Sequence, residues 1–211
     1  MTVLVFEGPD NLGKSTIINS FVREYKDVRD ICMMHSTGPH CKNGEDPFEY
    51  QKNSFFNKVK KIITLSEYND ISGLKNDDIV IMDRSWIGEY VYGQIYRNGN
   101  SDKILDMIND CNLMLNNSNI HCIFIRLNAS VDFIISHDDN KSLTSLYDIE
   151  KKKKSVEQEI ELFEDVFNKM KMSEMSTKMT INVQDTCNNY RSINFIYDEI
   201  KSNVLSAGII L

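Results

Sequence analysis

The segment from Gly8 to Ser15, GPDNLGKS, has the spacing GxxxxGK[ST]. Glycines at these positions let the backbone curl, so that successive amide N–H groups converge on phosphate oxygens. Lys14 supplies a cation for the β- and γ-phosphates of ATP, and Ser15 supplies a hydroxyl ligand for Mg²⁺. The motif therefore predicts a phosphate-binding loop (P-loop). Its predicted nucleotide-binding residues are Gly8, Asn11, Leu12, Gly13, Lys14, Ser15 and Thr16.

A carboxylate and an arginine follow a second apolar run. Residues 79–82 read IVIM, which is typical of a buried strand, and Asp83 and Arg84 come directly after them. Ligands of α/β folds bind at the carboxyl ends of such strands. We therefore expect Asp83 to hold the Mg²⁺ shell, through water, and Arg84 to reach a phosphate in the crevice.

These groups must be positioned by strands that alternate with helices. Apolar, β-branched runs predict strands at 2–6, 31–34, 79–82, 120–127 and around 181–183. Apolar residues at helical spacing predict helices from residue 14, around 55–63, from about 86, over 104–115 and over about 156–170. This alternation predicts an α/β fold with a parallel five-stranded sheet and helices on both faces.

Composition narrows the classes of function. The 211 residues suit a single domain over 1–211. Thirty-one acidic against 24 basic residues give a net charge of −7, which argues against a partner such as duplex nucleic acid and favours a small-molecule partner. The apolar runs are too short to cross a membrane, and the amino terminus reads as a strand rather than a signal peptide, so we expect a cytoplasmic protein.

Phe6–Thr16, taken together with residues 83–85 (DRS), resembles the thymidylate kinase family of nucleoside-monophosphate kinases. The stretch 83–97 resembles bacteriophage members of that family. The resemblance implies a three-layer P-loop kinase fold with a short mobile lid, here at about 136–150, and a homodimer. It also implies ATP-dependent phosphorylation of a deoxynucleoside 5′-monophosphate, with dTMP as the preferred acceptor.

Several acceptor-site residues are implied by the same resemblance. Asp10 matches the acid that faces the acceptor sugar and Mg²⁺, Arg84 the arginine that holds the acceptor phosphate, and Tyr92 the tyrosine that crowds the sugar. Phe56 and Lys60 match an aromatic residue stacked on thymine and a base that contacts its ring.

The orientation of Phe56 also follows from helical spacing. Phe55 shares an apolar stripe with Val59 and should face the core. Phe56 is then turned by about 100° and is expected to meet a ligand.

The sequence departs from the family where arginines usually serve phosphoryl transfer. Asn11 stands at the P-loop position where the family can carry an arginine, and Gly93 stands where it has a glutamine. No arginine occurs between Arg126 and Arg191. The predicted lid therefore lacks an arginine. Arg97 is our candidate for the cation that stabilises the transition state, with Lys141 as the second candidate.

Two alternatives remain open at this level. Deoxynucleoside kinases carry a glutamate just before the P-loop glycine that activates a 5′-hydroxyl, and Glu7 matches that position. Glu7 does not discriminate, because thymidylate kinases share it, whereas Asp83 in place of that family's glutamate favours a monophosphate acceptor. The other alternative is a non-catalytic P-loop protein that binds nucleotide without an acceptor pocket.

Overall fold

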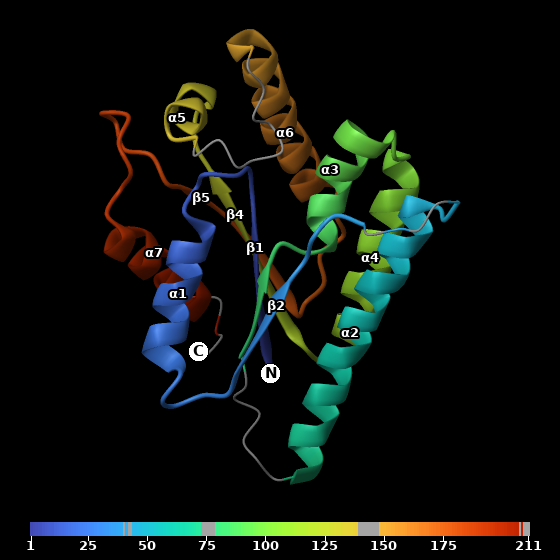
Figure 1. The fold of residues 1–211 in the computed structure, drawn as a ribbon. Coiled ribbons are helices and arrows are strands. Elements are labelled where there is room, and N and C mark those ends of the chain that lie inside the picture. The colour runs from blue at the N-terminus through green and yellow to red at the C-terminus, as the bar shows by residue number, and fades with distance from the viewer. Residues whose placement is uncertain (40, 42–43, 73–78, 139–147, 207, 209–211) are drawn as a thin grey trace.

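The computed structural model describes residues 1–39, 41, 44–72, 79–138, 148–206 and 208, with backbone only for 69–72. The chain runs through twelve helices and strands within these residues (Figure 1). The strands are β1 (Thr2–Glu7), β2 (Ile31–His35), β3 (Ile79–Asp83), β4 (His121–Asn128) and β5 (Ser176–Asn182). The helices are α1 (Lys14–Tyr25), α2 (Pro47–Ser72), α3 (Trp86–Arg97), α4 (Ser101–Asn117), α5 (Val131–Ser136), α6 (Ile149–Lys169) and α7 (Ile193–Ser206).

The five strands form one parallel sheet in the order β2-β3-β1-β4-β5. The register places Phe6 of β1 opposite Asp83 of β3, and Asp83 opposite His35 of β2. The carboxyl ends of the three strands therefore meet at one edge of the sheet, directly before the P-loop and α3. This is the edge at which parallel sheets bind ligands.

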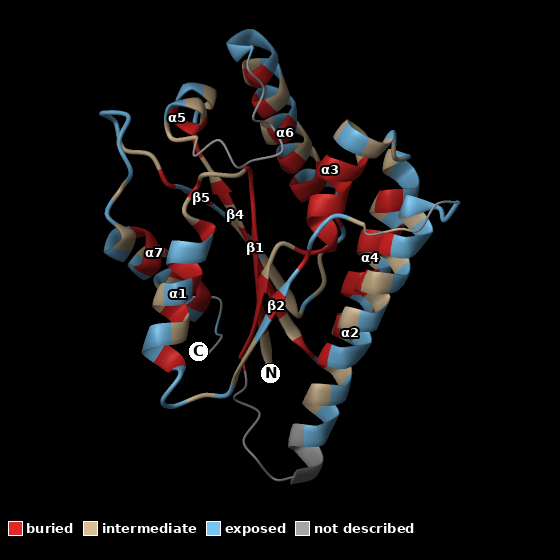
Figure 2. Cartoon of the chain, viewed as in Figure 1, coloured by how far each residue is buried: buried red, intermediate tan, exposed pale blue. Residues whose placement is uncertain are grey.

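Alternation along the strands divides the core into two layers. In β1, Leu4 and Phe6 pack with α1, α5 and α7, whereas Val3 and Val5 pack with α2, α3, α4 and the end of α6. Figure 1 shows the same division, with α1 and α7 on one side of the sheet and α2, α3 and α4 on the other. Both faces of β1 are buried (Figure 2). The predicted three-layer arrangement is confirmed.

The predicted strands at 2–6, 31–34, 79–82 and 120–127 are confirmed, and the last strand lies earlier than expected, at Ser176–Asn182. This edge strand is buried only at Ile181, so its apolar signal is weak. Helices α5 and α7 are not predicted from the sequence, although α7 has buried residues at helical spacing, Ile196, Tyr197, Ile200 and Val204. Most of the predicted lid, residues 139–147, lies outside the described residues. None of the described helices is long and apolar enough to span a membrane.

Candidate functional site

The P-loop connects β1 to α1 and is held in a tight curl. Gly8, Asn11 and Gly13 adopt positive φ angles of 129°, 62° and 73°. At Gly8 the loop also lies so close to β4 that a Cβ atom would clash with the carbonyl oxygen of Leu127. Glycine is therefore required at position 8 both for its conformation and for its space.

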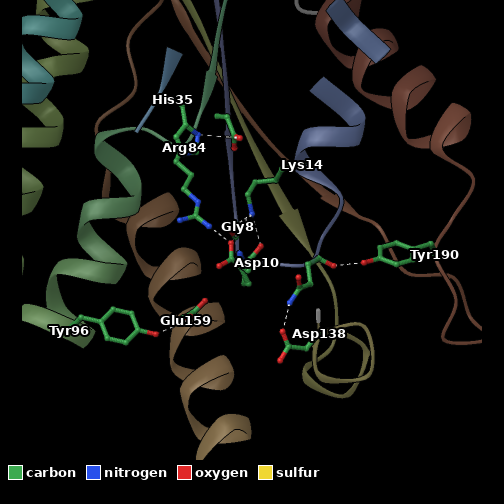
Figure 3. A network of polar contacts seen from close by, with 12 residues as sticks. Gly8, Asp10, Lys14, His35, Arg84, Tyr96, Asp138, Glu159 and Tyr190 are labelled. Atoms are coloured by element: carbon green, nitrogen blue, oxygen red, sulfur yellow. Dashed lines mark hydrogen bonds and ion pairs between the residues drawn. The ribbon is translucent and has the colours of Figure 1, made fainter. Parts of the chain in front are cut away.

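Lys14 closes this loop from inside. Its Nζ donates hydrogen bonds to the carbonyl oxygens of Gly8 (2.8 Å) and Pro9 (2.6 Å), as Figure 3 shows for Gly8. Burial lowers the pKa of Lys14, and the neighbouring Asp10, whose carboxylate lies 3.9 Å from Nζ, opposes that effect. The ammonium group is thus hydrogen-bonded to carbonyl oxygens of the loop, and it can turn from them to the oxygens of a bound phosphate.

A cavity lies over the P-loop at the carboxyl edge of the sheet. It brings the predicted loop residues other than Gly8 together with His35, Asp83 and Arg84. Ser15 and Asp83, the predicted Mg²⁺ ligands, both line it. Their hydroxyl and carboxylate oxygens are the hard donors that Mg²⁺ prefers, and the ion also takes oxygens from phosphates and water. The two side chains therefore fit a Mg²⁺-nucleotide complex in this cavity.

Arg84 lies between the P-loop and α3. Its backbone has a φ of 64°, which is uncommon for a residue with a side chain. Its guanidinium forms a salt bridge with Asp10 and lies over the ring of Tyr92, with Cζ 5.4 Å from the ring centre. Asp10, Arg84 and Tyr92, which the resemblance assigns to the acceptor site, are thus in contact through the guanidinium of Arg84.

A second cavity adjoins the first through Arg84, which lines both. We call it the acceptor cavity. Its lining residues come from the loop after β2, from α2, from the turn between β3 and α3, and from α3: Ser36, Thr37, Gly38, Gln51, Phe55, Arg84, Ser85, Gly88, Glu89, Tyr92 and Arg97.

The structure places Phe55, rather than Phe56, in the wall of this cavity. Phe56 is half-buried, packs against the core layer around α2, and lies near Lys52. Lys60 is exposed and does not line the cavity. The helical spacing correctly puts Phe55 on the buried face of α2, but that face borders the cavity as well as the core.

Arg97 also lies in the acceptor cavity rather than in the P-loop cavity. Its Nη2 is 2.6 Å from Oε2 of Glu89, a carboxylate that is 4% exposed. Burial raises the pKa of Glu89, while hydrogen bonds from Arg97 and Gln51 lower it. Lys141, the second candidate for the transition-state cation, falls outside the described residues.

Glu7 is fully buried where β1 meets the P-loop. Its Oε1 accepts hydrogen bonds from the backbone N and the hydroxyl of Ser85 (both 2.6 Å) and from the backbone N of Gly88 (3.3 Å). Its Oε2 has no hydrogen-bond donor among the described residues. This oxygen lies behind Gly88 in the wall of the acceptor cavity, 3.3 Å from where a Cβ of Gly88 would stand. Burial raises the pKa of Glu7 to about 7.

Further polar groups near the P-loop were not singled out from the sequence. Asn11 donates to Asp138 (3.0 Å), which forms a salt bridge with Lys152 at the start of α6. The hydroxyl of Tyr190 donates to the backbone oxygen of Asn11 (Figure 3). Each contact joins residues from separate parts of the chain, so no local sequence pattern predicts it.

Glu159 of α6 is a further buried carboxylate near the P-loop. It lies near the hydroxyl of Tyr96, which donates to it at 3.4 Å (Figure 3). Burial and the charge of Asp10 raise its pKa to about 7.

The chain is similar in structure to polyphosphate kinase 2 from Arthrobacter aurescens TC1 (TM-score 0.62, 13% identity), covering 98% of this chain and 66% of that one. A putative polyphosphate kinase 2 from Pseudomonas aeruginosa PA01 matches with a TM-score of 0.63 and 14% identity, over 98% of this chain and 42% of that one. This chain therefore spans less than two thirds of either protein.

The YorR protein from Bacillus subtilis, in complex with phosphorylated GDP, matches with a TM-score of 0.54 and 17% identity, over 99% of both chains. No protein-family model and no curated protein matches the sequence. The structural similarities show that the chain has the fold of P-loop kinases, with a five-stranded parallel sheet flanked by helices.

Proposed function

We propose that this protein transfers the γ-phosphate of ATP to a deoxynucleoside 5′-monophosphate. The observation that carries the proposal is the position of Arg84, which lines both the P-loop cavity and the acceptor cavity. Phosphoryl transfer requires donor and acceptor to meet in line, with cations around the transferring group. The guanidinium of Arg84, which lines both adjoining cavities, is suited to the place where the donor and the acceptor meet.

The residues on the P-loop side have distinct tasks. The loop amides and Lys14 would bind the β- and γ-phosphates, and Ser15 and Asp83 would hold Mg²⁺, an ion that supplies positive charge beside the phosphates when it is bound. Asp10 holds Arg84 in place through their salt bridge. Tyr92 lines the acceptor cavity beside Arg84. The resemblance implies that this tyrosine crowds the acceptor sugar, so we expect a deoxyribose to be preferred over a ribose.

The neighbours are consistent with this class of reaction. Two are named polyphosphate kinase 2 and the third binds phosphorylated GDP. Phosphate transfer and nucleotide binding are properties of those proteins, and the P-loop cavity supports extending them to this chain.

A second candidate function is favoured by Glu7. A nucleoside acceptor presents a 5′-hydroxyl that needs a general base, whereas a monophosphate is already ionised. A buried carboxyl with a pKa of about 7 and one unpartnered oxygen behind Gly88 has the properties of such a base. Under this alternative, the protein is a deoxynucleoside kinase.

The two functions are separated by measuring ADP release with Mg-ATP and a panel of deoxynucleoside 5′-monophosphates and deoxynucleosides. We expect turnover with monophosphates, and the resemblance to thymidylate kinases predicts dTMP as the best of them. Glu7→Gln preserves Oε1 as the acceptor for Ser85 and Gly88, and should leave monophosphate turnover within a few-fold of wild type.

Turnover confined to nucleosides and lost in Glu7→Gln would establish the deoxynucleoside kinase instead. Nucleotide binding with no turnover for any acceptor would indicate the non-catalytic P-loop protein.

A further inference from the structure

One peptide unit of the P-loop is held by a residue from a distant part of the chain. The backbone oxygen of Asn11 accepts a hydrogen bond from the hydroxyl of Tyr190, which lies between β5 and α7 (Figure 3). The side chain of Asn11 donates to Asp138, at 3.0 Å. Asn11 has a φ of 62°, a left-handed conformation that is uncommon for a residue with a side chain. Two contacts from outside the loop therefore restrain a residue in an uncommon backbone conformation.

The direction of the Asn11 carbonyl determines the direction of the next amide. The peptide bond between Asn11 and Leu12 is trans, and the C=O and N–H of a planar trans peptide point to opposite sides. Figure 3 shows Tyr190 reaching the loop from the side away from Lys14 and Asp10. The N–H of Leu12 is therefore directed away from Tyr190, to the side of the loop where Lys14 and Asp10 lie. Leu12, Lys14 and Asp10 all line the P-loop cavity.

Packing fixes the position of Tyr190. Its ring meets the rings of Phe133 and His137 edge-on, with ring centres 4.7 Å and 4.6 Å away. Phe133 is fully buried in α5, and His137 ends that helix. The backbone of Tyr190 forms an antiparallel bridge with Gln184. The hydroxyl is therefore presented at one place, and forming the bond to Asn11 costs little side-chain entropy.

A restraint on this peptide matters for binding phosphate. Amide donors that already point at the phosphate position bind it without a cost of reorganising the loop. If the carbonyl of Asn11 is released, the peptide can turn, and the apparent affinity falls with the fraction of molecules in the binding-competent conformation. A contact outside the motif can thus set the affinity of the motif for phosphate.

We propose that Tyr190 is a positioning residue for phosphate binding: it holds the carbonyl of Asn11 so that the N–H of Leu12 is available to the phosphates of the nucleotide. This role rests on the proposed function, because it requires a triphosphate at the P-loop, but it does not depend on the acceptor. The GxxxxGK[ST] motif ends at Ser15, so the role belongs to a residue far outside the motif.

Tyr190 also lines a cavity on the side of the P-loop that faces α7. This cavity shares Leu12, Gly13 and Thr16 with the P-loop cavity. A nucleoside bound there would touch the ring of Tyr190 directly. The effect of Tyr190 on the phosphates must therefore be separated from a contact with the nucleoside.

Calorimetry with Mg-ATP and with Mg-tripolyphosphate, which has no nucleoside, separates these two roles. Tyr190→Phe removes the hydroxyl and keeps the ring that packs against Phe133 and His137. We expect the affinities for both ligands to fall by the same factor, about three- to tenfold, as for one lost hydrogen bond. Tyr68→Phe, at an exposed position of α2, is the matched control and should keep both wild-type affinities. Thermal melts check that each variant folds.

Three outcomes of this comparison would overturn the role of Tyr190. A loss confined to Mg-ATP would show that Tyr190 contacts the nucleoside, and unchanged affinities for both ligands would show that its hydroxyl is not needed. A wild type that binds Mg-ATP but not Mg-tripolyphosphate would also count against it, because an organised loop should bind phosphates without a nucleoside. Binding of neither ligand would overturn the proposed function as well.

A second variant tests whether Tyr190 acts through Asn11. Asn11→Gly keeps the backbone carbonyl and removes the contact with Asp138, and glycine adopts both signs of φ readily. The bond from Tyr190 is then the remaining restraint of the two. We therefore expect Tyr190→Phe to lower the affinity for Mg-tripolyphosphate by a factor at least about twice as large in the Asn11→Gly background as in wild type. Equal factors in the two backgrounds would show that Tyr190 does not act through this peptide.

Steady-state ADP release gives an independent readout. In Tyr190→Phe, the KM for ATP should rise by the factor measured in calorimetry, while kcat stays within about twofold, because the restraint acts on ground-state binding. The KM for the acceptor should not change, since Tyr190 does not line the acceptor cavity. A fall in kcat with an unchanged KM for ATP would contradict a positioning role. The expected loss of binding in a protein that turns over no acceptor would sustain the role of Tyr190 and overturn the proposed function.

Discussion

Lys14 is the residue on which phosphoryl transfer should depend most directly. Its side chain is buried, and its ammonium group is held by two carbonyl oxygens of the loop. Lys14→Met keeps the aliphatic stem and removes only the charge, so the fold should persist. We expect kcat to fall by about 10²- to 10³-fold, because the lost charge stabilises the transferring group. Steady-state kinetics at saturating Mg-ATP measure this effect.

The matched control is Lys26→Met, an exposed lysine just after α1, which should leave kcat unchanged. Near-normal turnover of Lys14→Met would remove Lys14 from the mechanism. Melting temperatures of both variants distinguish a lost charge from a lost fold.

At the scale of elements, α6 is connected to the P-loop through Asp138. Lys152 near the start of α6 is buried, and its salt bridge to Asp138 continues into the hydrogen bond between Asp138 and Asn11. Asn11 stands where the thymidylate kinase pattern has an arginine, and Arg97 lies in the acceptor cavity. We therefore expect Lys152 to reach the phosphates when a nucleotide replaces Asp138 as its partner.

We expect Lys152→Met to lower kcat by about 10²-fold, with a smaller change in the KM for ATP, because the contact tightens in the transition state. Lys152→Arg keeps the cation and should recover most of the activity. The neighbouring Lys151→Met is the control, since that side chain is 73% exposed and pairs with Asp148 at the helix start. If Lys152→Met leaves kcat unchanged and Arg97→Met lowers it strongly, then Arg97 is the cation that stabilises the transition state.

At the scale of the whole molecule, two buried carboxyls should shape the dependence of stability on pH. Burial raises the pKa of Glu7 and of Glu159 to about 7, from an ordinary value of 4.5. Between these pH values the folded protein keeps protons that the unfolded chain has released. The free energy of unfolding should therefore fall as pH rises from about 4.5 to 7, and this loss should be complete above that window.

Urea unfolding at a series of pH values measures this slope in wild type, Glu7→Gln and Glu159→Gln. Each variant should gain stability relative to wild type as pH rises through the window, whereas Glu161→Gln, at an exposed site, should run parallel to wild type. Glu24 and Asp165 have lowered pKa values because they accept hydrogen bonds from lysine and tyrosine side chains. They therefore affect the free energy of unfolding at pH values below this window. If the free energy of unfolding depends on pH in the same way in wild type and in all variants, the raised pKa values of Glu7 and Glu159 do not cause the slope.

Short stretches of the sequence are enough to predict the sheet, the P-loop and the edge of the sheet that carries the candidate site. Apolar strands and helical stripes are local patterns, and GxxxxGK[ST] is a contiguous motif, so the positions of Lys14, Ser15 and Asp83 follow from short stretches of chain. The weakly patterned β5 was placed too late, and α7 was missed although its stripe is visible. Both lie at the far end of the chain, away from the motif.

The set of side chains that meet in the acceptor cavity depends on tertiary packing and could not be predicted from the sequence. The cavity borders the buried face of α2, so Phe55 and Gln51 line it and Phe56 does not. Glu89 and Arg97 pair across two turns of α3, and Lys152 of α6 forms a salt bridge with Asp138, which lies outside that helix. Periodicity predicts which face of a helix is buried, but burial against a core and burial against a ligand produce the same pattern of apolar residues. Which of the two occurs depends on where neighbouring elements leave space, and long-range packing alone sets that.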